Sequence, residues 1–343
     1  MPRDTQQSIR HKIDAATYAD PKVVLDNLIV EADISYIDRA QISTSATQLV
    51  RDIRAETSPG MMEVFLAEYG LSTDEGVALM CLAEALLRVP DADTIDALIE
   101  DKIAPSDWGR HLGHSTSSLV NASTWALMLT GRVLDDDQPG PVRHLRAAIK
   151  RLGEPVIRTA VSRAMKEMGR QFVLGETIDS AMERARGMEK KGYTYSYDML
   201  GEAARTEADA KRYHLSYSRA ISAIASACTS EDIRKNPGIS VKLSALHPRY
   251  ELAQEDAVMR DLVPRLRALA LLAKSAGMGL NVDAEEADRL ALSMEVIDRV
   301  MGEPALAGWD GFGVVVQAYG MRAAPVIDML YDMAERHERK IMV

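Results

Sequence analysis

A lysine and an aspartate end two apolar segments in the second half of the chain. Ile239 and Val241 share one face of an expected strand, so Lys242 falls on the opposite face. Further along, the apolar segment 280–283 ends in Asp283. A lysine among apolar residues needs an anionic partner, because burying an unpaired charge is costly. The two segment ends therefore predict a charged, partly buried site.

These apolar segments alternate with helical patterns. We expect strands at 193–200, 239–245, 280–283 and 313–319, helices at 206–227, 255–276, 287–301 and 323–339, and the opening of a fifth strand at 340–343. Repeated strand–helix units favour a parallel sheet with right-handed crossovers. A Gly-x-Gly-x-x-Gly pattern does not follow the first expected strand, which disfavours a dinucleotide-binding sheet. The sequence thus predicts an α/β fold, a (β/α)8 TIM-like barrel of which it holds the first half; we expect the barrel to continue beyond Val343.

The segment before the expected barrel reads as helical almost throughout. A capping box at 72–75 opens an apolar, buried helix at 76–88. We therefore expect an N-terminal arm at 1–55, a helical domain at 56–190 and the half barrel at 191–343. The arm carries two short amphipathic stretches, 23–29 and 40–53, which must pack on something else. A second subunit is one candidate, which would make the protein a homo-oligomer.

Barrel enzymes carry their chemistry at the carboxyl ends of the strands. The polar residues expected there are Asp198, Glu202, Lys242, Ser244, His247, Arg249, Asp283, Glu285, Glu286, Gln317 and Tyr319. A lysine among carboxylates stays protonated and can hold an anion, while a carboxylate can orient a basic group or a substrate amine. Lys242 and Asp283 are the strongest candidates, whereas Glu285, Glu286 and Arg249 fit ordinary solvated loop residues equally well.

Composition excludes several classes of function. The formal net charge of −10 and pI near 5.3 oppose binding to a phosphate backbone, so we expect no nucleic-acid partner. The sequence contains neither a signal peptide nor a membrane span, and Cys81 and Cys228 lie in apolar helical patterns. These features predict a cytoplasmic protein. His111 and His114 lack further ligands at suitable spacing, so we predict no metal site.

Four ordered motifs resemble a known family. They are Tyr195-Ser-Tyr-Asp-Met-Leu-Gly-Glu-Ala-Ala204, Ile239-Ser-Val-Lys-Leu-Ser-Ala-Leu-His-Pro-Arg-Tyr250, Asn281-Val-Asp-Ala-Glu-Glu-Ala-Asp-Arg-Leu290 and Trp309-Asp-Gly-Phe-Gly-Val-Val-Val-Gln-Ala-Tyr319. In order and spacing they are similar to the proline dehydrogenase domain of the bacterial proline utilization A flavoenzymes. The similarity extends upstream through 71–90 and 172–178, so it covers about residues 60 to 343.

This resemblance implies a distorted (β/α)8 barrel that binds FAD and oxidises L-proline to Δ1-pyrroline-5-carboxylate. Hydride would pass from proline C5 to flavin N5, and the electrons would continue to a membrane quinone, with peripheral contact at the inner membrane face. The full-length protein would carry an NAD-dependent aldehyde dehydrogenase module that produces glutamate. Residues 1–30 do not resemble the ribbon-helix-helix module of DNA-binding members, so the resemblance favours the purely enzymatic type.

The resemblance also assigns roles to individual residues. Lys242 would pair with the proline carboxylate, and Asp283 would occupy the catalytic position of the third strand. Ala284 would place its backbone against the flavin ring, and Gln317 would hydrogen-bond to it. Asp198 and Glu202 would orient basic residues that close over the substrate.

Two other classes of function remain open on the residues alone. A lysine on a barrel strand also suits a Schiff-base enzyme of the aldolase kind, with Lys242 as the nucleophile. A non-catalytic protein, whose helical half serves as an interaction module, is the third reading. A Ser-His-Asp hydrolase is disfavoured because the sequence has no Gly-x-Ser-x-Gly elbow.

Overall fold

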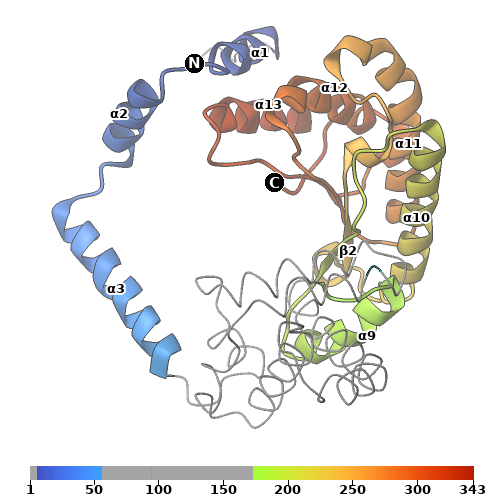
Figure 1. The fold of residues 1–343 in the computed structure, drawn as a ribbon, viewed down its shortest axis with the longest axis horizontal. Helices are drawn as coiled ribbons and strands as arrows, with labels where there is room; N and C mark the ends of the chain where they lie inside the picture. Colours follow the sequence, from blue (N-terminus) through green and yellow to red (C-terminus); the bar gives the residue numbers. More distant parts are fainter. Residues whose placement is uncertain (1–5, 56–93, 95–172) are drawn as a thin grey trace, which may run out of the picture. The chain divides into compact units, whose positions relative to one another are not determined.

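The computed structural model describes residues 6–55, 94 and 173–343 (Figure 1). Its chain divides into two compact units: Met1–Ser35 together with Gly175–Val343, and Tyr36–Leu174. Several predictions lie outside the described residues: the capping box at 72–75, the helix at 76–88, Cys81, His111, His114 and most of the helical domain 56–190.

A four-stranded parallel sheet forms the centre of the first unit. The strands are β1 (Ser196–Asp198), β2 (Gly238–Val241), β3 (Leu280–Val282) and β4 (Phe312–Val314), in the order β1-β2-β3-β4. A parallel bridge from Gly313 to Met342 begins the next strand position. This order of adjacent, parallel strands is that of a barrel and confirms the predicted α/β fold, the first half of a TIM-like barrel preceded by helices.

The strands are shorter than predicted at their carboxyl ends. The expected strand 239–245 ends at Val241, and Leu243–Ala245 forms a short 3₁₀ turn, η3. Likewise the expected strand 313–319 ends at Val314. Beyond Val241, the side chains of Tyr217 and Glu285 accept the backbone N–H groups of Lys242 and Ser244. Beyond Val314, the N–H of Val315 still donates to Val282 O at 2.9 Å.

A helix follows each strand and lies outside the sheet (Figure 1). These helices are α10 (Glu207–Ala225), α11 (Glu255–Ser275), α12 (Leu290–Met301) and α13 (Ala323–Arg336), with α9 (Ile178–Glu189) before β1. Short 3₁₀ turns lie between them at Ile233–Lys235, Leu252–Gln254, Ala287–Arg289 and Pro304–Leu306. A capping box of Thr206 and Asp209 starts α10, one residue after the predicted start at 206.

The two faces of the sheet differ in chemistry. Residues that face the helices are buried and apolar: Tyr197, Ile239, Val241, Leu280, Val282, Phe312 and Val314. The other face is small and polar, with Ser196 Oγ 3.1 Å from Ser240 Oγ and Asn281 Nδ2 donating to Ser196 Oγ at 3.3 Å. A Cβ atom at Gly313 would lie 1.8 Å from Asn281 Oδ1, so a larger residue there would displace the Asn281 side chain. The predicted alternation therefore separates a core face from a polar interior face.

Three helices precede the described part of the barrel. Helix α1 (Gln6–Ala15) packs on α13 and buries Ile9 and Ile13; its Gln6 and Arg10 bond to Asp298 and Glu295 of α12. The sequence analysis did not predict α1. Because α1 packs on α13, this part of the arm finds its packing partner within the same chain.

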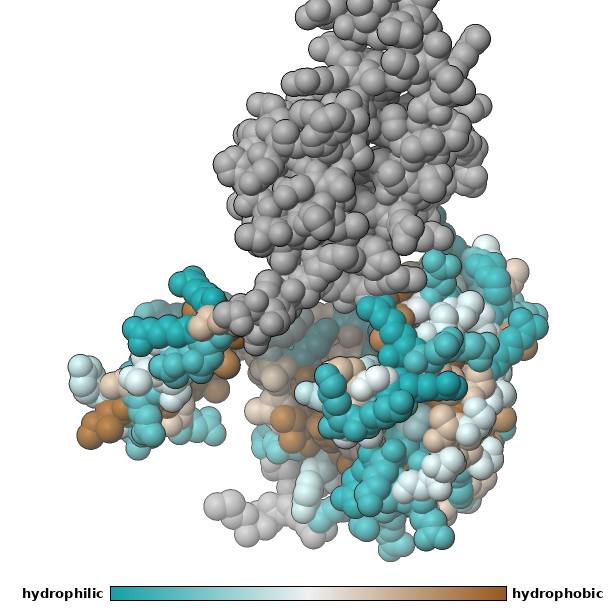
Figure 2. Space-filling model, turned by 90° about the horizontal axis from the view of Figure 1, so that it is seen from below, coloured by the Kyte–Doolittle hydropathy of each residue, from teal (hydrophilic) through white to brown (hydrophobic). Residues whose placement is uncertain are grey.

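The predicted amphipathic stretches 23–29 and 40–53 belong to longer helices, α2 (Pro21–Ala32) and α3 (Tyr36–Ala55). Hydrophobic side chains are exposed on α2, including Leu25, Ile29 and Val30, and hydrophobic surface is visible on the N-terminal helices in Figure 2. Within the described ranges, no helix combines the length and apolar character needed to cross a membrane.

Candidate active site at the strand ends

Strand register brings Lys242 and Asp283 together. Ser240 pairs with Asn281 across β2 and β3, so the residues two positions further, Lys242 and Asp283, are also neighbours on the interior face. Lys242 Nζ donates hydrogen bonds to Asp283 Oδ2 at 2.9 Å and to Asp198 Oδ1, at the end of β1, at 2.7 Å. Asp198, Lys242 and Asp283 form one ionic group, which we call the Lys242 cluster.

The members of the Lys242 cluster differ in exposure. Side-chain exposure is 17% for Lys242 and 19% for Asp283, but 52% for Asp198. Burial alone would lower the pKa of Lys242, but its hydrogen bonds to Asp198 and Asp283 outweigh burial and raise that pKa. The amine therefore stays cationic at physiological pH. The Lys242–Asp283 pair is the less exposed part of the cluster, and Asp198 faces the solvent.

The loop after β1 places Glu202 outside the cluster. Glu202 is exposed and lies between Gly201 and Ala203, both with positive φ, of 134° and 51° respectively. A Cβ atom at Gly201 would lie 2.5 Å from the ring of Tyr213, which favours glycine there for a second reason. The structure thus brings together Asp198, Lys242 and Asp283 of the predicted residues, and leaves Glu202 at the rim.

Glu285 is half-buried and clamps the turn after β2. Its carboxylate accepts hydrogen bonds from the backbone N–H of Ser244 at 2.9 Å and from the Ser244 hydroxyl. Ser244 in turn accepts the backbone N–H groups of Ala203 and Ala204, both at 2.9 Å. Burial raises the pKa of Glu285, although the bonds from Ser244 oppose that shift. The sequence left Glu285 open between a site residue and an ordinary loop residue, because its hydrogen-bond partner lies in another loop.

Gln317 joins the loop after β4 to the loop after β3. Its Nε2 donates to the carbonyl oxygens of Ala284 and Glu285 at 3.4 and 3.3 Å. The amide of Gln317 and the backbone of Ala284 thus lie beside each other at the strand ends. Tyr319 is 87% exposed and stands apart from this contact.

His247 and Arg249 serve the turn rather than the cluster. The ring Nδ1 of His247 accepts the backbone N–H of Arg249 at 3.1 Å, and Arg249 pairs with Glu251 at the surface. Burial lowers the pKa of His247, with Asp261 acting in the opposite direction. His247 is therefore a neutral residue of the turn.

Two helix residues that the sequence analysis did not identify, buried Tyr217 and partly exposed Arg265, support the turn after β2. Tyr217 of α10 accepts the backbone N–H of Lys242 at 3.2 Å, and Arg265 of α11 donates to the carbonyl of Leu246 at 2.6 Å. Both residues are polar and lie among the apolar positions of their helices. That pattern is the sequence signal that could have identified them.

The arrangement has the features of a site for a small anion beside a planar group. Lys242 supplies a cation beside an interior face that carries Ser196, Ser240, Asn281 and Gly313, which are all small or polar residues. Gln317 Nε2 and the Ala284 backbone could hydrogen-bond to a heterocycle there. In the part of the chain that the structure describes, His, Cys, Asp and Glu side chains form no group of three suited to a metal ion.

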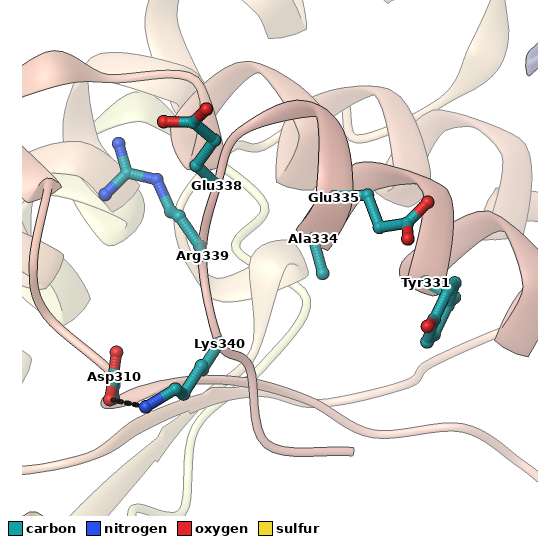
Figure 3. Close-up of a pocket in the computed structure, with 7 residues that line it drawn as sticks. All are labelled: Asp310, Tyr331, Ala334, Glu335, Glu338, Arg339 and Lys340. Atoms are coloured by element: carbon teal, nitrogen blue, oxygen red, sulfur yellow. Dashed lines mark ion pairs between the residues drawn. The ribbon is translucent and has the colours of Figure 1, made fainter.

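A pocket of about 400 Å³ lies elsewhere (Figure 3). Its walls come from the carboxyl half of α13 and the segment that follows, with an ion pair of 3.4 Å between Lys340 and Asp310. Asp310 precedes β4, so the pocket is at the amino ends of the strands, away from the Lys242 cluster. In barrel enzymes this end contributes to stability rather than chemistry.

Comparison with family models matches three consecutive parts of the chain. Residues 7–54 match the proline utilization A proline dehydrogenase N-terminal domain, residues 61–172 match a model described as the DNA-binding domain of proline dehydrogenase, and residues 181–343 match proline dehydrogenase. The last match contains every residue of the Lys242 cluster.

Comparison with individual proteins also finds proline utilization A and proline dehydrogenase proteins as relatives. The bifunctional protein PutA of Salmonella typhimurium is 48% identical over 343 residues, covering 98% of this chain and 26% of that protein. Proline dehydrogenase 1 of Bacillus subtilis is 28% identical over 164 residues, 48% of each chain. A crystal structure of a Bradyrhizobium japonicum proline utilization A mutant is 47% identical, with a TM-score of 0.63 over 95% of this chain and 32% of that one. The chain thus spans about a quarter of the length of the PutA relative.

Proposed function

Because this chain belongs to the proline utilization A family, we propose that it supplies the substrate carboxylate site and part of the flavin site of an L-proline dehydrogenase. The reaction would oxidise L-proline to Δ1-pyrroline-5-carboxylate. The observation that carries this proposal is the ionic pair of Lys242 and Asp283, joined at 2.9 Å where two adjacent strands end.

Proline is a zwitterion with a carboxylate and a ring nitrogen on adjacent positions. Lys242 is cationic and mostly buried, so it can pair with the substrate carboxylate with little screening by water. Asp283 fixes the direction of the amine and places a negative charge near the substrate nitrogen. Asp198, which is half exposed, is the partner that an incoming carboxylate can most easily displace from Lys242.

We propose FAD as the cofactor. Gln317 and the backbone of Ala284 would hold its ring, and the bound flavin would supply the acceptor for the hydride of proline C5. The contribution of the protein is then orientation: the carboxylate fixed by Lys242 directs the ring carbon toward the flavin. Asp198 and Glu202 would orient basic residues that close over the substrate from the remainder of the barrel.

The other properties of the complete protein are inferred from the family. We propose electron transfer to a quinone by a cytoplasmic enzyme with peripheral membrane contact, and a downstream NAD-dependent aldehyde dehydrogenase that makes glutamate. The prediction that the protein does not bind nucleic acid stays open to test, since one matched family model names DNA binding in its description. A DNA mobility-shift assay with the full-length protein is the test.

The Schiff-base alternative has less support. A nucleophilic lysine needs a lowered pKa, so that the neutral amine is present at physiological pH. Carboxylate partners raise the pKa of Lys242 instead. The third reading, a non-catalytic interaction module, gains no support from the matched families.

The full-length protein tests the proposal directly. We expect a yellow protein that absorbs near about 450 nm, as bound oxidised flavin does, and that loses this absorbance when L-proline is added without an electron acceptor. D-Proline, which cannot present its carboxylate to Lys242 and C5 to the flavin in the same pose, is the matched control. A colourless protein, or a flavin that L-proline does not reduce, would contradict the proposed function.

A further inference from the structure

The backbone N–H of Lys242 donates its hydrogen bond to a group outside the sheet. Along β2, Gly238 donates its N–H to the β1 side, at Tyr195 O, and Ile239 donates to the β3 side, at Gly279 O. By this alternation the N–H of Lys242 points to the β1 side. Gly238 bonds to Tyr195 O, so by the same offset Lys242 would bond to the carbonyl of Met199, but β1 ends one residue earlier, at Asp198.

A helix side chain replaces the missing strand. Tyr217, on α10, is 1% exposed and accepts the Lys242 N–H through its hydroxyl oxygen at 3.2 Å. Burial raises the pKa of Tyr217 to about 12, so the hydroxyl stays neutral and available for hydrogen bonding. The same residue that carries the cation of the cluster is thus fixed at its backbone by a group from beneath the sheet.

We propose that Tyr217 is a positioning residue for substrate carboxylate binding: its hydroxyl holds the backbone of Lys242 so that the amine reaches the substrate between Asp198 and Asp283. This inference rests on the proposed function, and it adds a residue from α10, outside the strand-end loops, to the machinery of that site. Tyr217 itself stands behind Lys242 and has no contact with the substrate in this account.

The neighbouring contacts explain why one hydroxyl can matter. Beyond Lys242 the backbone turns into η3, where Ser244 is held by Glu285 and Leu246 by Arg265. Tyr217 thus holds the backbone where the turn starts, and Glu285 and Arg265 hold it further along. Without the hydroxyl, the Lys242 N–H is left without a partner in a buried position, and the start of the turn is free to shift toward water.

The test uses the full-length protein with Tyr217→Phe, which removes the hydroxyl and keeps the ring. The matched control is Ser218→Ala, which deletes the adjacent hydroxyl; that group donates to His214 O within the same helix. Two ligands separate the roles: cyclopentanecarboxylate has the acid without the ring amine, and pyrrolidine has the amine without the acid. Dissociation constants follow from changes in flavin absorbance, and proline kinetics give KM and kcat.

We expect Tyr217→Phe to weaken cyclopentanecarboxylate binding at least about fivefold and to raise the KM for proline by a similar factor, with a smaller change in kcat. Pyrrolidine binding should stay as in the wild type, and Ser218→Ala should change neither ligand. In a Lys242→Met background, Tyr217→Phe should have no further effect on the carboxylate, because the amine it positions is gone.

Three results would overturn the inference while the proposed function stands: unchanged carboxylate affinity in Tyr217→Phe, equal losses for both ligands, or loss of flavin from Tyr217→Phe alone. The second and third would mean that the hydroxyl serves general folding. A wild-type protein that neither oxidises proline nor binds the carboxylate would contradict the proposed function, and the inference with it.

Discussion

Replacing Lys242 by methionine removes the cation from the proposed carboxylate site and keeps most of the side-chain volume. In the structure, Nζ lies 2.7 Å from Asp198 Oδ1 and 2.9 Å from Asp283 Oδ2, and the lysine side chain is 17% exposed. Substrate would lose its charged hydrogen bond, and it would meet two carboxylates that no longer have a cation between them. Both effects act against binding of an anion.

The expected size follows from these contacts. A hydrogen bond to a charged partner contributes about 1.5–3 kcal/mol. At about 1.4 kcal/mol per factor of ten, kcat/KM for proline should fall by about 10-fold to about 150-fold from this bond alone. Repulsion by Asp198 and Asp283 adds to that loss, although their protonation relieves part of it. We therefore expect a fall of at least about tenfold.

Steady-state kinetics of the full-length protein with an artificial electron acceptor provide the measurement. Lys274→Met is the matched control: Lys274 is also a lysine whose Nζ makes two bonds, to Ala305 O at 2.9 Å and Ala307 O at 2.8 Å, but it lies at the opposite end of the sheet. It should leave KM unchanged. Lys242→Arg, which keeps the charge in a different shape, should fall between Lys242→Met and the wild type.

One outcome would refute this reasoning. If Lys242→Met retained its flavin and turned over proline with the KM and kcat of the wild type, the cation at this position would play no part in binding, and the assignment of the site would fail. A loss confined to the control variant would lead to the same conclusion.

Further variants of the full-length protein test the supporting contacts. Glu285→Ala leaves two groups of Ser244 without an acceptor and should lower the unfolding free energy by about 1–3 kcal/mol in urea titrations. The raised pKa of Glu285 means that its contribution to stability is greatest below its ordinary pKa and declines as pH rises through the raised pKa; Glu285→Gln should abolish that decline. Asn236→Ala removes three hydrogen bonds between segments and should cost about 2–3 kcal/mol, seen as an earlier melting transition. His337 and Arg336 hold the pKa of Asp298 low against the effect of burial, so its contribution is present above the ordinary pKa and lost as pH falls through the lowered one; Asp298→Asn should destabilise the protein at pH 7 and match the wild type in strong acid.

Local sequence patterns predicted the order of strands and helices in the half barrel, and they singled out Lys242 and Asp283, which the structure brings into contact at the strand ends. Alternation in apolar segments indicated four strands, and the residues that end them included Lys242 and Asp283. The strand limits were less accurate, because the apolar pattern at 243–245 and 315 continues after the ladder stops. Helix α1 was missed, since its packing on α13 involves residues from opposite ends of the sequence.

The sequence by itself determined which residues stand at the strand ends and on which face, because side-chain direction along a strand follows from a period of two. Only the tertiary structure decided which of them meet. The register of β2 against β3 places Asp283 beside Lys242. Because β1 ends early, the Lys242 N–H bonds to Tyr217 instead of to a strand carbonyl. The packing of two loops places Glu285 beside Ser244. These contacts join residues that are 25 to 41 positions apart, and at such separations the partner depends on how the elements pack together.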